Sequence, residues 1–262
     1  MRHAFKTLTG VLFCLVALGC GAPDETPAFG TPQDLALLTT DTVELAATLY
    51  PPARKNPPGL ILVHDRLGSR AHFAAFAARA QREGYLSIAV DLRGHGGSVP
   101  RNGTSLNPRA FAQDDWMRCL SDLESAKKTL LERGADPDNL AMVGAGLGAN
   151  LVLQYASRDE EIQAIVLLSP GLSYEGIEAE EALARYGKRP TLLVTSTGDS
   201  YAASTCEELH AKASSHCELR EYDGAAHGVD LLDAVEICPP QIFLWLEGIL
   251  GNGADREESG TR

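Results

Sequence analysis

Short apolar runs alternate along most of the chain with stretches in which apolar residues recur at helical spacing. The run at 59–64 has the length and composition of a buried strand, and Phe73, Phe76 and Ala80 then fall on one side of a helix. The alternation continues over about 35–250. It predicts βαβ units and therefore an α/β fold, with a mostly parallel central sheet and helices on both faces.

The pattern also places the individual elements. Polar and apolar residues alternate at 35–50, which predicts an antiparallel hairpin at a sheet edge. Further strands are predicted at 59–64, 86–90, 140–143, 164–168, 191–195 and 218–222. Helices are predicted at 70–83, 115–133, 147–156, 174–186, 206–213 and 242–250. We expect one domain over 35–250 and a polar tail over 251–262.

The N-terminal segment differs from the rest of the chain. A basic start precedes an apolar run at 11–18, which is too short to span a bilayer unaided. Small residues before Cys20 resemble the bacterial lipobox, in which the cysteine is lipidated. We therefore predict a signal peptide over 1–19, a lipid on Cys20 and a Pro- and Gly-rich tether over 20–34. A cleaved signal without lipid and an uncleaved anchor are the alternatives.

This reading predicts a lipoprotein of the bacterial cell envelope, held to a membrane by its lipid on the periplasmic side or the outer surface. The net charge of −12 argues against nucleic acid as a partner, because phosphates need Lys and Arg for neutralisation. In an oxidising compartment four cysteines could form two disulfides in any of three pairings. They are Cys119, Cys206, Cys217 and Cys238. Cysteine and histidine spacings do not indicate a zinc site, and we expect no metal or cofactor.

A glycine cluster follows the predicted strand at 140–143 and opens the next helix. Gly144, Gly146 and Gly148, with Leu147, match the G-x-S-x-G nucleophile elbow in all but the middle residue. Glycines suit this turn because the helix packs close to the strand. At the middle position, Gly146 offers no side chain at all.

Other motifs complete a resemblance. The run at 91–98 is similar to the D-x-R-G-H-G-x-S segment of the α/β-hydrolase family, and Asp199 and His227 each follow a predicted strand in the family's order. Over about 35–250 the chain is identified as a member of that family, most similar to dienelactone-hydrolase-like and serine-aminopeptidase-like esterases. The resemblance implies that Asp199 is the acid, that His227 is the base, and that Gly146 stands where the nucleophile belongs.

The loop after the first buried strand also departs from the family pattern. It resembles the family's His-Gly oxyanion loop, but Asp65 stands where glycine is usual. A carboxylate pointing into this loop would oppose a developing oxyanion, unless Arg66 neutralised it. Asp65 could equally point to solvent. We assign Asp65, Arg66 and Leu147 to the oxyanion and pocket region.

These features leave two hypotheses for function, and the enzymatic status open. Because Gly146 has no reactive atom, the first is a pseudo-enzyme with a ligand-binding or scaffold role, whose ligand is a small ester or acid. The alternative is a carboxylic-ester or dienelactone-type hydrolase in which Asp199 and His227 activate water or a non-standard nucleophile. Ser169, at the end of a neighbouring strand, is the nearest replacement nucleophile, although a turn role fits it better.

Overall fold

A computed structural model describes residues 29–100, 105–213 and 216–251. The predicted signal peptide, Cys20 and nearly all of the C-terminal tail lie outside these residues. Among the residues described, no helix has both the length and the apolar character needed to span a membrane.

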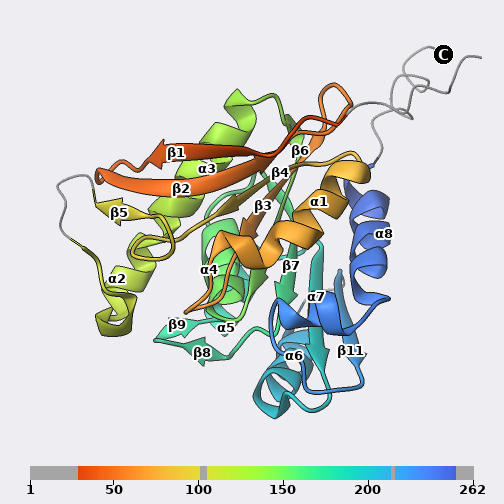
Figure 1. Ribbon diagram of the computed structural model, residues 1–262. Helices are drawn as coiled ribbons and strands as arrows, with labels where there is room; N and C mark the ends of the chain where they lie inside the picture. The colour runs from red at the N-terminus through yellow and green to blue at the C-terminus, as the bar shows by residue number, and fades with distance from the viewer. Residues whose placement is uncertain (1–28, 101–104, 214–215, 252–262) are drawn as a thin grey trace, which may run out of the picture.

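The described residues form a sheet of nine strands, eight of them in the order β1-β2-β4-β3-β6-β7-β10-β11, with β5 beside β2. The strands are β1 (Gln33–Leu38), β2 (Val43–Tyr50), β3 (Pro58–Val63), β4 (Leu86–Val90), β5 (Val99–Pro100), β6 (Asp136–Ala145), β7 (Ile162–Leu168), β10 (Thr191–Ser196) and β11 (Cys217–Tyr222). All neighbours from β4 to β11 are parallel, whereas β2 is antiparallel to its neighbours β1, β4 and β5. The predicted mostly parallel sheet and its edge hairpin are confirmed (Figure 1).

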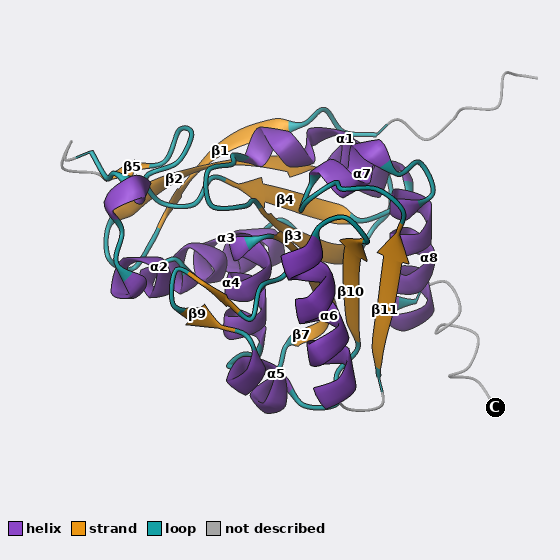
Figure 2. Cartoon of the chain, turned by 90° about the horizontal axis from the view of Figure 1, so that it is seen from below, coloured by secondary structure: helices purple, strands orange, loops and turns teal. Residues whose placement is uncertain are grey.

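Helices cover both faces of the sheet, as predicted. They are α1 (Ala74–Arg82), α2 (Gln113–Arg118), α3 (Leu120–Glu132), α4 (Leu147–Ala156), α5 (Glu180–Tyr186), α6 (Ser200–Lys212), α7 (Asp230–Ala234) and α8 (Cys238–Leu250). Short 3-10 turns occupy Arg70–Phe73 and Pro108–Ala110. Helices α1, α7 and α8 lie on one face, and α2 to α6 lie on the other (Figure 2). The apolar residues of each group belong to a separate core layer.

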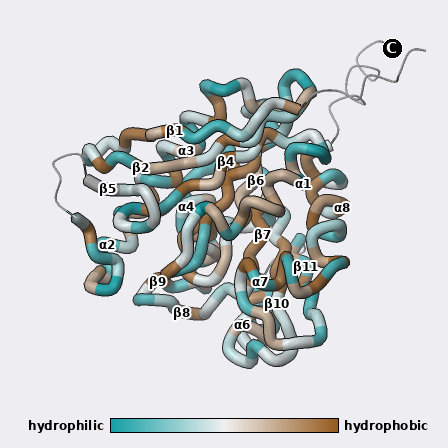
Figure 3. The backbone as a smooth tube through the Cα atoms, viewed as in Figure 1, coloured by the Kyte–Doolittle hydropathy of each residue, from teal (hydrophilic) through white to brown (hydrophobic). Residues whose placement is uncertain are grey.

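Alternation along the buried strands divides the core into two layers. Leu60 and Leu62 of β3 face the layer under α1 and α8, whereas Ile61 and Val63 face the layer under α3 and α4. Because both faces of the strand are covered, β3 is apolar throughout, which is typical of parallel sheets. The hydrophobic residues accordingly concentrate in the central strands (Figure 3).

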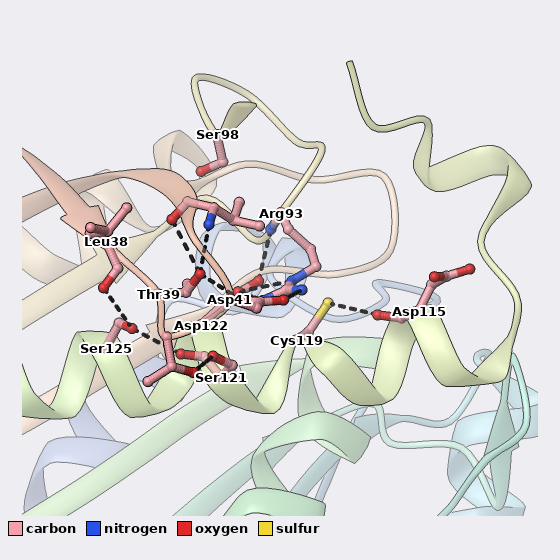
Figure 4. A network of polar contacts seen from close by, with 12 residues as sticks. Leu38, Thr39, Asp41, Arg93, Ser98, Asp115, Cys119, Ser121, Asp122 and Ser125 are labelled. Carbon is pink, nitrogen blue, oxygen red and sulfur yellow. Dashed lines mark hydrogen bonds and ion pairs between the residues drawn. The ribbon is translucent and has the colours of Figure 1, made fainter. Parts of the chain in front are cut away.

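A buried ion-pair network fixes the loop that follows β4. The Arg93 guanidinium donates from Nε to Asp122 Oδ1 at 3.0 Å and from Nη1 to Asp41 Oδ2 at 2.6 Å (Figure 4). Asp122 lies on α3 and Asp41 in the turn between β1 and β2. This single side chain therefore ties together three separate parts of the chain around the loop that carries His95.

Several element predictions are wrong in detail. The helix predicted at 115–133 is divided at Cys119 into α2 and α3, and the helix predicted at 242–250 begins at Cys238. The stretch at 174–186 is not one helix: it begins as the hairpin of β8 (Ser173–Tyr174) and β9 (Ile177–Glu178), and α5 starts only at Glu180. Glu175 and Gly176 both have positive φ, which a helix cannot contain. The helix predicted at 206–213 begins earlier, at Ser200, directly after Asp199, whose side chain makes no capping hydrogen bond.

The cysteines form no disulfide within the described residues. Cys119, Cys206 and Cys238 are buried free thiols, and Cys217 is a partly buried one. Burial raises the pKa of the Cys217 and Cys238 thiols to about 11, so both stay protonated at neutral pH.

Candidate active site

The turn between β6 and α4 is a sharp elbow built from glycines. Gly146 at its tip has φ 52° and ψ −122°, a conformation that residues with side chains rarely adopt. A Cβ on Gly148 would lie 2.3 Å from the carbonyl oxygen of His64, and one on Gly144 would lie 2.4 Å from the carbonyl oxygen of Gly148. The outer glycines are therefore required by the close contact of α4 with β3 and β6.

The space above Gly146 is filled by the carboxylate of Asp65. A Cβ placed on Gly146 would lie 2.2 Å from Asp65 Oδ1 and 2.6 Å from Asp65 Oδ2. Asp65 follows β3, so the loop that resembles the oxyanion loop reaches across to the elbow. Of the two orientations left open by the sequence, Asp65 adopts the one that points into the site.

Two backbone N–H groups hold this carboxylate. The N–H of Leu147 donates to Asp65 Oδ1 at 2.8 Å and that of Arg66 donates to the same oxygen at 2.6 Å. Leu147 is the first residue of α4, where backbone donors have no partner within the helix and the helix dipole favours negative charge. The guanidinium of Arg66 does not neutralise Asp65, because its Nε pairs with Glu175 Oε1 at 2.7 Å.

His64 and His95 support the loop that carries Asp65. His64 Nε2 accepts a hydrogen bond from the N–H of Leu92 at 3.0 Å, and its Nδ1 lies 2.6 Å from the carbonyl oxygen of Asp65. Burial lowers the pKa of His64 to about 4, so the ring is neutral and donates from Nδ1. His95 Nε2 lies 2.5 Å from the carbonyl oxygen of Arg66. His95 thus orders the loop.

His227 stands between two carboxylates. Its Nδ1 lies 2.6 Å from Asp199 Oδ2, and its Nε2 lies 3.5 Å from Asp65 Oδ2. The ion pair with Asp65, opposed by burial and assisted by Asp199, raises the pKa of His227 to about 9. Burial alone would raise the pKa of Asp65, but His227 and the two N–H donors lower it below its usual value. At neutral pH the site is therefore a carboxylate–imidazolium–carboxylate row.

This protonation state limits the chemistry of the site. A general base needs a free lone pair at Nε2, and an imidazolium has none. Activation of water by His227 therefore requires either a pH near or above 9 or the loss of the Asp65 charge. The acid and base expected from the sequence, Asp199 and His227, do meet, but they meet in a resting state that suits an ion pair better than base catalysis.

The site is open to solvent and bordered by aromatic rings. The side chains of Asp65 and His227 are 35% and 37% exposed. Tyr174, in the β8–β9 hairpin, packs edge-on against two rings. The distance between ring centroids is 6.4 Å to His227 and 5.5 Å to Tyr201. Tyr174 and Glu175 were missed from the sequence, because the prediction of one helix at 174–186 hid the hairpin that brings them to the site.

Ser169, the replacement nucleophile suggested by the sequence, and Ser157 of the helix after the elbow are both engaged elsewhere. Ser169 is buried, and its Oγ accepts the N–H of Gly228 at 3.0 Å. Ser157 is near the end of α4, and its Oγ donates to the carbonyl oxygen of Gln154 at 2.9 Å. In the described part of the chain, no three His, Cys, Asp or Glu side chains are grouped as metal ligands.

Comparison with known families agrees with this architecture. Residues 55–186 match the family model of serine aminopeptidases, S33. This chain belongs to the serine aminopeptidase family. The match spans the loop with Asp65, the Arg-Gly-His-Gly segment, the elbow and the β8–β9 hairpin, but it ends before Asp199 and His227.

The curated proteins that are similar to this member of the serine aminopeptidase family match only part of its chain. The quorum-quenching protein AidA of Acinetobacter baumannii is 27% identical over 141 residues, which are 53% of this chain and 44% of that protein. The polyketide transferase ATR5 of Stachybotrys chlorohalonatus is 27% identical over 147 residues, 55% of this chain and 46% of that protein. The matched region is thus less than half the length of either relative.

Solved structures share the fold over nearly the whole described chain. An esterase of Pyrococcus furiosus has a TM-score of 0.69 at 18% identity, with 89% of this chain and 96% of that chain covered. A dienelactone hydrolase of Anabaena variabilis has a TM-score of 0.66 at 20% identity, with 83% of this chain and 98% of that chain covered. At these identities the likeness establishes the α/β-hydrolase fold alone.

Proposed function

We propose that this protein is a pseudo-enzyme toward esters, lactones and other acyl compounds, which it binds without serine-type turnover. The observation that carries the proposal is the position of Asp65, whose carboxylate fills the space of a nucleophile on Gly146. Serine-type acyl transfer needs an atom that attacks the carbonyl carbon and a base that takes its proton. Here the attacking atom is missing at Gly146, and the base, His227, is already protonated.

Asp65 also occupies the donors that acyl transfer would use. A tetrahedral intermediate needs backbone N–H groups directed at its oxyanion. The N–H groups of Leu147 and Arg66 are both directed at Asp65 Oδ1 instead. Loss of a triad nucleophile costs about a millionfold in turnover, and loss of a single oxyanion donor costs about a hundredfold to a thousandfold. Both losses act in the same direction.

We further propose that the protein is a lipoprotein of the bacterial envelope, anchored through Cys20. The basic start, the apolar run at 11–18 and the small residues before Cys20 support this assignment. The partner at the membrane is then the lipid bilayer, and the ligand of the domain is a small ester or acid that binds beside the exposed side of His227.

Ester turnover tests the first proposal. Purified protein and His227→Ala are compared with p-nitrophenyl acetate and butyrate at neutral pH, and we expect equal background rates. A rate in the unaltered protein more than about tenfold above that of His227→Ala would contradict the proposal. Thermal-shift titration with short carboxylic acids and esters then tests binding, for which a rise in Tm is expected.

Direct activation of water by His227 is the second candidate, because the contact between His227 Nδ1 and Asp199 Oδ2 at 2.6 Å is intact. It predicts ester hydrolysis that depends on His227 and increases as pH rises through about 9, the pKa of His227. A flat pH profile in both proteins would eliminate it.

A further inference from the structure

We propose that this protein forms a two-fold homodimer in which the edge strand β11 pairs antiparallel with β11 of a second copy. The sheet ends at β11, which pairs with β10 alone among the strands that the structure describes (Figure 2). Every residue of β10 is buried, whereas every residue of β11 is at least partly exposed. An exposed edge strand is a template for pairing with another chain.

Alternate residues of β11 supply the backbone groups at the outer edge. The N–H of Thr191 donates to the carbonyl oxygen of His216 at 2.9 Å, and the N–H of Thr197 donates to that of Tyr222 at 2.9 Å. Successive residues of a strand direct their backbone groups to opposite sides, so the even-numbered residues of β11 bond to β10. The odd-numbered residues direct their N–H and C=O groups outward, where the described chain places no strand. They are Cys217, Leu219 and Glu221.

The charges of β11 select one register for this pairing. Outward-facing residues must lie opposite one another, and two-fold symmetry then centres the pairing on a single residue. The central choices are Glu218, Leu219 and Arg220. A centre on Glu218 or Arg220 would place that residue opposite its own copy, so that like charges meet. A centre on Leu219 places Glu218 of each copy opposite Arg220 of the other, which is favourable twice over.

The two charged side chains are held in place on the face toward α8. Trp245 Nε1 donates to Glu218 Oε1 at 2.9 Å, and Arg220 Nη1 donates to the carbonyl oxygen of Gln241 at 2.7 Å. Arg220 Nη2 and Glu218 Oε2 lie 3.4 Å apart, so the dimer would contain a row of four charges of alternating sign. At the other end of the sheet, β1 has Asp34 as its only charged residue and offers no such complementarity.

An apolar groove beside β11 lies next to the same charges. Its volume is about 450 Å³, and Glu218 and Arg220 form part of its lining. Its apolar lining residues are Pro190, Leu244, Trp245 and Ile249. Helix α8 makes its main strand contact with β7, two strands in from the edge, and so leaves this face of β11 open. The register centred on Leu219 brings Glu218 and Arg220 of the second copy beside the groove, where they shield its apolar wall from water.

Cysteine cross-linking tests the register. The proposed pairing places Glu221 of one copy opposite Cys217 of the other, with Cα atoms about 5.5 Å apart, which a disulfide can span. Within one chain the same two positions are about 13 Å apart along the strand, which is too far. Full-length Glu221→Cys, oxidised with copper–phenanthroline, should therefore run as a disulfide-linked dimer on a non-reducing gel. The matched control, Glu221→Cys/Cys217→Ser, should remain uncross-linked.

A proline at the outer edge tests the strand pairing itself. Glu221 is exposed and its N–H is directed away from β10, so Glu221→Pro removes a donor that the fold does not use. Glu221→Ala keeps this donor and is the matched control. By light scattering after size exclusion, we expect the unaltered protein and Glu221→Ala to have the mass of a dimer, and Glu221→Pro that of a monomer.

Charge reversal supplies an independent readout. Arg220→Glu places two carboxylates opposite each other and should raise the dissociation constant of the dimer about tenfold or more. Glu218→Arg/Arg220→Glu restores opposite charges across the two-fold axis and should recover the dimer. Because this double variant also lacks the native contacts to Trp245 and Gln241, damage to the fold predicts no recovery. An unaltered protein that stays monomeric, a dimer in which Glu221→Cys fails to cross-link, or a charge swap without recovery would each overturn the proposal.

Discussion

Asp65 and Gly146 share one space: the carboxylate of the first lies where a side chain on the second would begin. A Cβ on Gly146 would be 2.2 Å from Asp65 Oδ1, far inside van der Waals contact. The two departures from the family pattern are therefore a matched pair, since the aspartate needs the glycine for room. Because Asp65 and Gly146 depend on each other in this way, substitutions at either residue should have measurable effects.

Gly146→Ala should destabilise the protein by about 2 kcal/mol or more, because the new Cβ collides with Asp65 and φ is 52°. Urea denaturation measures the change in the free energy of unfolding. The double variant Asp65→Gly/Gly146→Ala removes the collision and should recover at least about 1 kcal/mol of that loss. Strictly additive effects of the two substitutions would show that the carboxylate does not fill this space.

Gly148→Ala should cost about 3 kcal/mol or more, because its Cβ would lie 2.3 Å from the carbonyl oxygen of His64, which cannot move without displacing β3. Gly248→Ala is the matched control. Gly248 lies within α8 with no atom near its added Cβ, so the same substitution there should stabilise the protein by about 0.5–1 kcal/mol. Similar losses at both positions would refute the close packing of the elbow.

The ion pairs of His227 predict a pH-dependent stability. The pKa of His227 is raised from 6.5 to about 9 in the folded state, so its stabilisation is complete below pH 6.5 and is lost as pH rises through about 9. The difference in unfolding free energy between the unaltered protein and His227→Gln should shrink by on the order of 1 kcal/mol over that range. Solvent screening of a ring that is 37% exposed keeps the change this small.

An NMR titration of the same ring separates the contribution of Asp65. In Asp65→Asn the pKa of His227 should fall, because the largest cause of its increase is removed. An unchanged pKa would mean that Asp199 alone determines the protonation of His227. It would contradict the carboxylate–imidazolium–carboxylate row as the resting state of the site.

Anchoring through Cys20 predicts that the protein expressed in a bacterium incorporates radiolabelled palmitate and sediments with membranes. Cys20→Ser should abolish both, because the sulfur of Cys20 is the atom to which the lipid is attached. Cys14→Ser, within the same export segment, should leave both unchanged and is the control. Palmitate incorporation that survives Cys20→Ser would contradict the assignment.

Much of this architecture was predictable, because hydrophobic period and chain order are local signals. The buried strand at 59–64, the elbow at Gly146 and the placement of Asp199 and His227 after successive strands all followed from them. The orientation of Asp65 could not be predicted in this way. It depends on the space left by the missing side chain of Gly146, which is about eighty residues further along the chain. The hairpin at Tyr174 was also missed, because acidic residues at helical spacing concealed the turn with positive φ at Glu175.

Covalent labelling by a fluorophosphonate probe tests the central claim most directly. The unaltered protein should remain unlabelled, because Gly146 carries no nucleophile and Asp65 holds the N–H groups of Leu147 and Arg66. Asp65→Gly/Gly146→Ser should become labelled, since it frees those donors and places a hydroxyl beside His227. Labelling of the unaltered protein at any residue of this site would contradict the account.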